Sequence, residues 1–173
     1  MSATVFERRN VWLVALDAGV WAVWSTLCGY LAHRVPVERL RGDGFLFRVR
    51  RVERPGRLYE RVWRIKRWKG LLPEAGALFK GGFSKRQVVG RDREYLERFA
   101  VETRRAELTH WLVMSIAPLF FLWNPWWLGL AMVGYALAAN LPCLLTQRYN
   151  RARLLRMLVR RGVARSTSDE EEQ

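Results

Sequence analysis

The chain has 173 residues, which suits a single domain, and half of them are hydrophobic although the formal net charge is +14. The apolar residues fall in long blocks rather than at helical or strand spacing, which argues against a soluble domain. The charge shares the chain with these blocks and no nucleic-acid-binding motif is present, so the high basicity does not indicate a nucleic-acid partner.

The first apolar block runs from Val11 to Ala32, with Asp17 as its only charged residue. A hydrocarbon core needs about 20 apolar residues, so the block is long enough to cross it. It has no clear small-residue cleavage site and is too long for a signal-peptide core, so we expect a retained membrane helix. An acid inside such a helix is a functional candidate, although Asp17 could equally lie near a water-filled edge.

Two further apolar blocks, 106–123 and 126–145, flank the sequence Trp-Asn-Pro-Trp-Trp at 123–127. Asn-Pro is a turn signal, and the neighbouring indoles are typical of an aromatic belt at a membrane interface. The two blocks therefore predict a helical hairpin with a short connection. Together with 11–32 they predict an all-α integral membrane protein with about three transmembrane helices.

The basic residues predict an orientation. Of the 30 lysines and arginines, 21 lie between residues 33 and 107 and seven follow Leu145, whereas the Asn-Pro turn has none. By the positive-inside rule, the middle segment 33–105 and the C-terminus lie on the cytoplasmic side of the cell membrane. Three spans then place the N-terminus outside, which Arg8 and Arg9 oppose. The alternative is a first block that is re-entrant or lies in the interface.

The middle segment contains basic amphipathic patterns. Within 58–68, apolar residues recur at helical spacing with basic residues between them, which is typical of a helix on an anionic membrane surface. The alternative is a helix that packs on protein. The glycine turn at 79–86 could bind phosphate or be a plain loop. We expect residues 1–165 to form one membrane-embedded domain and the acidic tail, 166–173, to be disordered.

Glu107 and His110 are the strongest candidates for chemistry. On a helix, residues three apart share a face, so the carboxylate could hold one ring nitrogen and leave the other as a general base. The alternative is a structural pair that caps the helix. A Glu-x-x-His motif also occurs in di-metal bundles, but those sites need a second motif and further carboxylates, so we predict no metal site.

Other polar residues are candidates for substrate contacts. Asn140 lies inside the third apolar block, where an unbonded amide is costly, so it could bond across the hairpin, face a substrate or stabilise an oxyanion. The alternating run at 147–153 could grip the phosphates of a donor, or simply mark the cytoplasmic end of a span. His33 is expected to be interfacial. The predicted substrate-binding residues are Glu102, Arg105, Arg148, Tyr149, Asn150 and Arg151.

Three motifs resemble a known family. They are Glu-Thr-x-Arg-Ala-Glu-Leu-x-His-Trp at 102–111, Tyr-Ala-x-x-Ala-Asn-x-Pro at 135–142 and Gln-Arg-Tyr-Asn-Arg-x-Arg-Leu at 147–154. In order and composition they resemble the glycosyl-4,4′-diaponeurosporenoate acyltransferases, small membrane enzymes of staphyloxanthin-type carotenoid biosynthesis. The resemblance covers the second half well and the first half thinly, and the segment around 79–86 departs from it.

The resemblance implies transfer of a fatty acyl group to a sugar hydroxyl of a glycosylated carotenoid or similar glycolipid. We expect an acyl thioester, acyl-CoA or acyl carrier protein, as co-substrate and no bound cofactor. Membrane lipid is the other expected partner. Two alternatives stay open: an acyltransferase for another acceptor, such as a lysophospholipid, and a non-catalytic membrane adaptor that binds anionic lipid.

Overall fold

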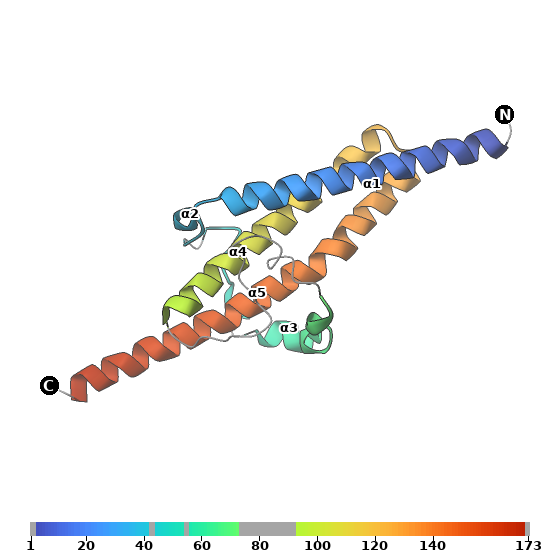
Figure 1. Ribbon diagram of the computed structural model, residues 1–173. Helices are drawn as coiled ribbons and strands as arrows, with labels where there is room; N and C mark the ends of the chain where they lie inside the picture. Colours follow the sequence, from blue (N-terminus) through green and yellow to red (C-terminus); the bar gives the residue numbers. More distant parts are fainter. Residues whose placement is uncertain (1–2, 42–43, 54–55, 73–92, 172–173) are drawn as a thin grey trace. The chain divides into compact units, whose positions relative to one another are not determined.

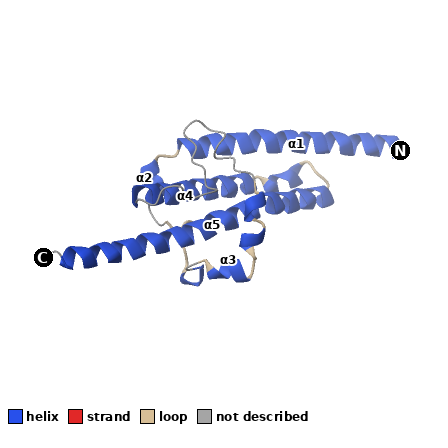
Figure 2. Ribbon diagram, turned by 60° about the horizontal axis from the view of Figure 1, so that its bottom comes forward, coloured by secondary structure: helices blue, strands red, loops and turns tan. Residues whose placement is uncertain are grey.

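The computed structural model describes residues 3–41, 44–53, 56–72 and 93–171. All regular structure in these ranges is helical, as the sequence predicts (Figure 2). The chain divides into two compact units. The first combines Met1–Arg34 with Leu108–Leu141, and the second combines Val35–Glu107 with Pro142–Gln173.

The first unit is built from the long helix α1 (Ala3–Arg34) and three shorter pieces (Figure 1). These pieces are the end of α4 (Arg93–Ser115), the 3-10 helix η5 (Ala117–Leu122) and the start of α5 (Trp126–Glu171). Trp21 stacks on Phe120, with ring centroids 5.1 Å apart. The buried core of the unit consists of Trp21, Cys28, Val113, Ile116, Ala117, Phe120 and Ala136.

Among the described residues, two helices are long and apolar enough to cross a membrane, Asn10–Arg34 and Trp126–Val159. The predicted third span at 106–123 is not confirmed. Its α-helix ends at Ser115, and a 3-10 helix with Pro118 near its start follows. Proline has no backbone N–H and its ring clashes with the preceding turn, which explains why the α-helix does not continue.

Asp17 is tied to the turn between η5 and α5. Its side chain is 1% exposed. Its carboxylate accepts hydrogen bonds from Trp123 Nε1 at 2.8 Å and from Asn124 Nδ2 at 2.9 and 3.0 Å. The acid therefore satisfies the donors of the Asn-Pro turn, and this turn lies beside α1 (Figure 1). This contact supports a structural role for Asp17.

We expect Asp17→Leu to destabilise the first unit by about 2–5 kcal/mol, because it leaves the buried amide of Asn124 and the half-buried indole of Trp123 without an acceptor. Thermal and urea unfolding in detergent micelles would measure the loss. Leu16→Ala is the matched control, since Leu16 is the exposed neighbour on the same helix. Equal stability of Asp17→Leu and the parent protein would contradict the structural role.

The second unit surrounds the other parts of α4 and α5 with short helices. These are α2 (Val37–Arg41), η1 (Arg51–Glu53), α3 (Arg57–Arg61), η2 (Ile65–Arg67) and η3 (Lys69–Leu71). One apolar cluster joins Tyr59 and Ile65 to Tyr149 of α5. Gly56, at φ 95°, permits this packing, because an added Cβ would lie 3.1 Å from the Tyr149 ring.

The single amphipathic helix predicted for 58–68 is wrong. Arg64 adopts a left-handed conformation at φ 47°, which breaks the segment into α3 and η2. Ile65 is buried against protein, whereas Val62, predicted on the same apolar face, is 61% exposed. The alternative of packing on protein therefore holds for the buried side of this segment.

Residues 45–47 form a turn, closed by the backbone amides of Phe47 and Arg48, which both donate to the Gly44 carbonyl. The glycine turn at 79–86 lies outside the described residues. The structure also differs from expectation near the C-terminus of the chain. Helix α5 extends to Glu171 and so includes most of the tail for which the sequence predicts disorder.

Candidate functional site

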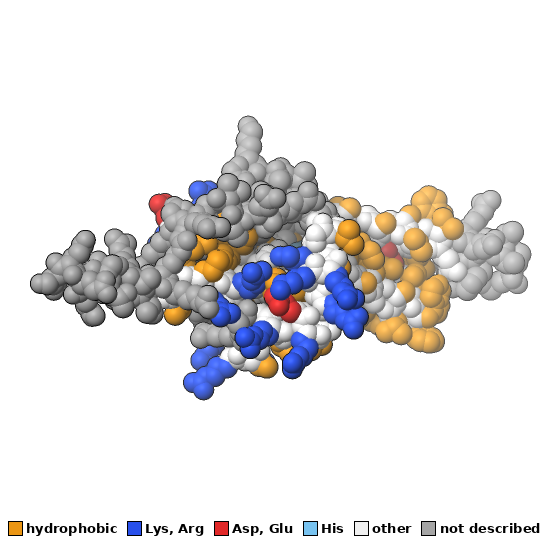
Figure 3. Space-filling view, turned by 90° about the horizontal axis from the view of Figure 1, so that it is seen from below, with side chains coloured by type: hydrophobic (Ala, Val, Ile, Leu, Met, Phe, Trp, Pro, Cys, Tyr) orange, Lys and Arg blue, Asp and Glu red, His pale blue; other side chains and the backbone are white. Residues whose placement is uncertain are grey.

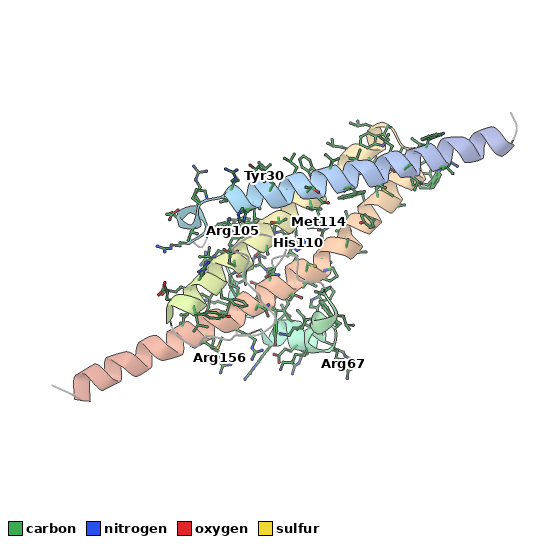
Figure 4. The ribbon with its side chains drawn as sticks, in the orientation of Figure 1. Tyr30, Arg67, Arg105, His110, Met114 and Arg156 are labelled. Atoms are coloured by element: carbon green, nitrogen blue, oxygen red, sulfur yellow. The ribbon has the colours of Figure 1, made fainter. Side chains whose placement is uncertain are left out.

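His110 is held by Asn140 within the first unit. Ring Nδ1 lies 3.0 Å from Asn140 Oδ1, and Asn140 Nδ2 donates to the carbonyl of Ala136 at 2.9 Å. Since the amide nitrogen is directed to the helix backbone, its oxygen faces the ring and Nδ1 must carry the proton. The neutral imidazole then has its lone pair on Nε2. Asn140 is buried and His110, which is labelled on α4 in Figure 4, is half-buried, so this tautomer is held in place.

Glu107 precedes His110 by one helical turn on α4 but belongs to the second unit. Its side chain is fully buried. One oxygen accepts from Arg148 Nη1 at 2.6 Å, and the other is ion-paired with Arg151 Nη2 at 2.5 Å. Both oxygens of Glu107 thus contact arginines, and the bond that the structure gives to Nδ1 of His110 comes from Asn140.

Arg148 connects three segments of the second unit. It donates from Nε and Nη2 to the carboxylate of Glu53, at 3.0 and 3.1 Å. It also donates to Glu107 and to the carbonyls of Leu46 and Arg48. Every nitrogen of its guanidinium is therefore bonded within the protein. This geometry favours a structural clamp over the phosphate grip predicted for Arg148.

Glu53 was missed by the sequence reasoning. It accepts from Tyr59 Oη and the Arg50 amide at 2.6 Å each, as well as from Arg148. The sequence did contain a signal for it, because acidic residues are rare in this basic segment: Glu53 and Glu60 are the only two between residues 44 and 72. An acid in so basic a segment points to an internal partner.

The remaining predicted substrate-binding residues have protein partners or are half-buried. Arg105 donates to the Val35 carbonyl at 2.9 Å and is ion-paired with Glu102 at 3.3 Å. Buried Tyr149 donates to Glu60 at 2.8 Å. Asn150 is half-buried. On the face that carries α3, basic side chains gather around acidic ones (Figure 3).

Glu53 gives the second unit a pH dependence. Burial raises the pKa of Glu53, but hydrogen bonds from Arg148, Tyr59 and the Arg50 amide outweigh this effect and hold the pKa below its ordinary value of 4.5. A lowered folded-state pKa means that the stabilisation is present above pH 4.5 and is lost as the pH falls through the folded value.

We therefore expect the unfolding free energy to stay level from pH 7 to about 5 and to fall at lower pH. Denaturant unfolding across this range would measure the curve. In Glu53→Gln the decline should be shallower, because the group that takes up the proton is gone. An unchanged slope in this variant would assign the acid sensitivity to other carboxylates.

Comparison with known proteins identifies the family. The model of the glycosyl-4,4′-diaponeurosporenoate acyltransferase family matches residues 43–160. An enzyme of this name from Staphylococcus haemolyticus (strain JCSC1435) is 38% identical over 136 residues, which cover 77% of this chain and 79% of the relative. One from Staphylococcus aureus (strain USA300) is 30% identical over 146 residues, 82% of this chain and 87% of the relative.

No solved structure shows a significant match. The matched region includes all three motifs from which the sequence resemblance was drawn, and the resemblance is confirmed. The chain belongs to the glycosyl-4,4′-diaponeurosporenoate acyltransferase family.

Proposed function

We propose that this protein transfers a fatty acyl group from a thioester donor to a sugar hydroxyl of a glycosylated carotenoid, with His110 as general base. The family relationship supports the acyl transfer and the class of acceptor. The hydrogen bond between His110 Nδ1 and Asn140 Oδ1 is the observation that supports the base, because it directs the basic lone pair to Nε2.

In this mechanism Nε2 takes the proton as the hydroxyl oxygen attacks the thioester carbonyl. A C–O bond forms, the tetrahedral intermediate collapses, and the C–S bond breaks. The imidazolium returns its proton to the leaving thiolate. Asn140 Oδ1 accepts from Nδ1–H throughout and so stabilises the charged ring. We assign Asn140 to this orienting role in place of an oxyanion contact, since its nitrogen is bonded to the Ala136 carbonyl.

We further propose that α1 and the apolar part of α5 cross the cell membrane, that the apolar segment 106–123 returns the chain across it between them, and that the basic segments face the cytoplasm. The length and apolar character of the two helices support the crossing. The concentration of basic residues at 33–107 and after Leu145 supports the orientation. A thioester donor from the cytoplasm would then meet the acceptor at the membrane surface.

The function is tested with purified full-length protein in liposomes. Acyl-CoA and acyl carrier protein would each be supplied as donor, with a glycosylated carotenoid, its sugar-free carotenoid acid, a glycolipid and a lysophospholipid as acceptors. We expect ester formation with the glycosylated carotenoid and none with the sugar-free acid. Preferred acylation of the lysophospholipid would contradict the acceptor, and a lack of turnover with every pair would favour the adaptor.

A further inference from the structure

Arg151 is a fully buried guanidinium that leaves most of its N–H groups unused. Its side chain is 0% exposed, and within the described part of the chain its Nε and Nη1 make no hydrogen bond. Its Nη2 is ion-paired with Glu107 Oε2 at 2.5 Å. Buried polar groups are nearly always bonded, so the unused N–H groups of this side chain call for an explanation.

The charges around Arg151 do not balance it well. Arg151 and Arg148 are both ion-paired with the carboxylate of Glu107. Arg148 is also ion-paired with a second carboxylate, that of Glu53. Arg104, buried and one turn before Glu107 on α4, adds a positive charge that acts on Arg151, as does that of Arg148. An additional anion beside Arg151 would therefore be attracted by both its charge and its unused N–H groups.

We infer that Arg151 binds a phosphate group of a ligand. The inference rests on the proposed function in one respect, because both thioester donors carry a phosphate in their pantetheine arm. A phospholipid headgroup offers the same chemistry, so the shared feature is the phosphate. Arg148, saturated by protein partners, holds Glu107 and the loop at 46–48 in place, and Arg151 contacts the ligand. Because Arg151 is buried, neighbouring side chains must move to admit the phosphate.

Binding experiments test this without turnover. The full-length protein in phosphatidylcholine nanodiscs would be titrated with 4′-phosphopantetheine and with pantetheine, which lacks the phosphate. We expect the parent protein to bind the phosphorylated compound more tightly, and Arg151→Gln to weaken this binding about 10- to 100-fold while leaving pantetheine binding unchanged. Arg151→Lys, which keeps the charge for Glu107, should show an intermediate loss and guards against a variant that fails to fold.

Arg156→Gln is the matched control, since Arg156 is an exposed arginine on the same helix (Figure 4). A second arm replaces phosphatidylcholine by phosphatidylglycerol. Lipid-dependent stabilisation that vanishes in Arg151→Gln, without phosphopantetheine binding, would support the site and name a phospholipid as its source. Equal binding of both probes in the parent and in Arg151→Gln, with no such lipid effect, would overturn the inference.

The outcome is separable from that of the proposed function. His110→Ala should bind phosphopantetheine as the parent does, whether or not acyl transfer is observed. Acyl transfer that is unaffected by Arg151→Gln would leave the proposed function intact and remove the donor as the source of the phosphate.

Discussion

Replacement of His110 by alanine is expected to lower the turnover number about 10²- to 10⁴-fold, the range for loss of a general base. The donor KM and the unfolding free energy should change little, because the ring is half-buried and its hydrogen bond to Asn140 is a neutral one. Initial rates at saturating donor, together with thermal unfolding of the same preparation, would separate lost chemistry from lost folding.

His33→Ala is the matched control, since His33 is the other of the two histidines in the chain and is exposed. It should retain full activity. Asn140→Ala should lower the turnover number about tenfold or more, because the ring loses the acceptor that selects its tautomer. Partial recovery of His110→Ala by added imidazole would strengthen the assignment, whereas parental activity in His110→Ala would remove His110 from the reaction.

The sequence predicts the helical class and its long apolar elements, because block hydrophobicity and turn residues are local signals. The first apolar block, 11–32, lies within a helix that passes the length and composition test for a span. The block at 106–123 does not, since Pro118 ends the α-helix early and hydropathy takes no account of backbone geometry. In the same way, the left-handed backbone conformation of Arg64 breaks the helix, although the apolar residues around it keep their helical spacing in the sequence.

The sequence predicts which residue types the candidate site contains, but it does not predict which of them are hydrogen-bonded or ion-paired to one another. The three-residue spacing of Glu107 and His110 suggested a pair, yet each side chain is bonded to a residue at least 30 positions away. Such bonds depend on tertiary packing of α4 and α5, which spacing along one helix cannot show. Whether a given arginine is saturated is also invisible in sequence, although it distinguishes Arg148 from Arg151.

Glu107→Gln is expected to lower the unfolding free energy by about 3–5 kcal/mol, because it leaves the buried guanidinium of Arg151 without its carboxylate and takes one of two carboxylates from half-buried Arg148. Denaturant unfolding in micelles would measure the loss. Glu102→Gln is the matched control on the same helix, since its ion pair with Arg105 is partly exposed and should contribute at most about 1 kcal/mol.

The double variant Glu107→Leu with Arg151→Met sharpens this prediction. It removes one buried charge of each sign and leaves Arg148 paired with Glu53. Replacing a buried ion pair by apolar side chains is often neutral or stabilising, so the double variant should recover most of the stability lost in Glu107→Gln. If it were as unstable as Glu107→Gln, the loss would come from the Glu107–Arg148 bond, and Arg151 would not be the charge left without a partner.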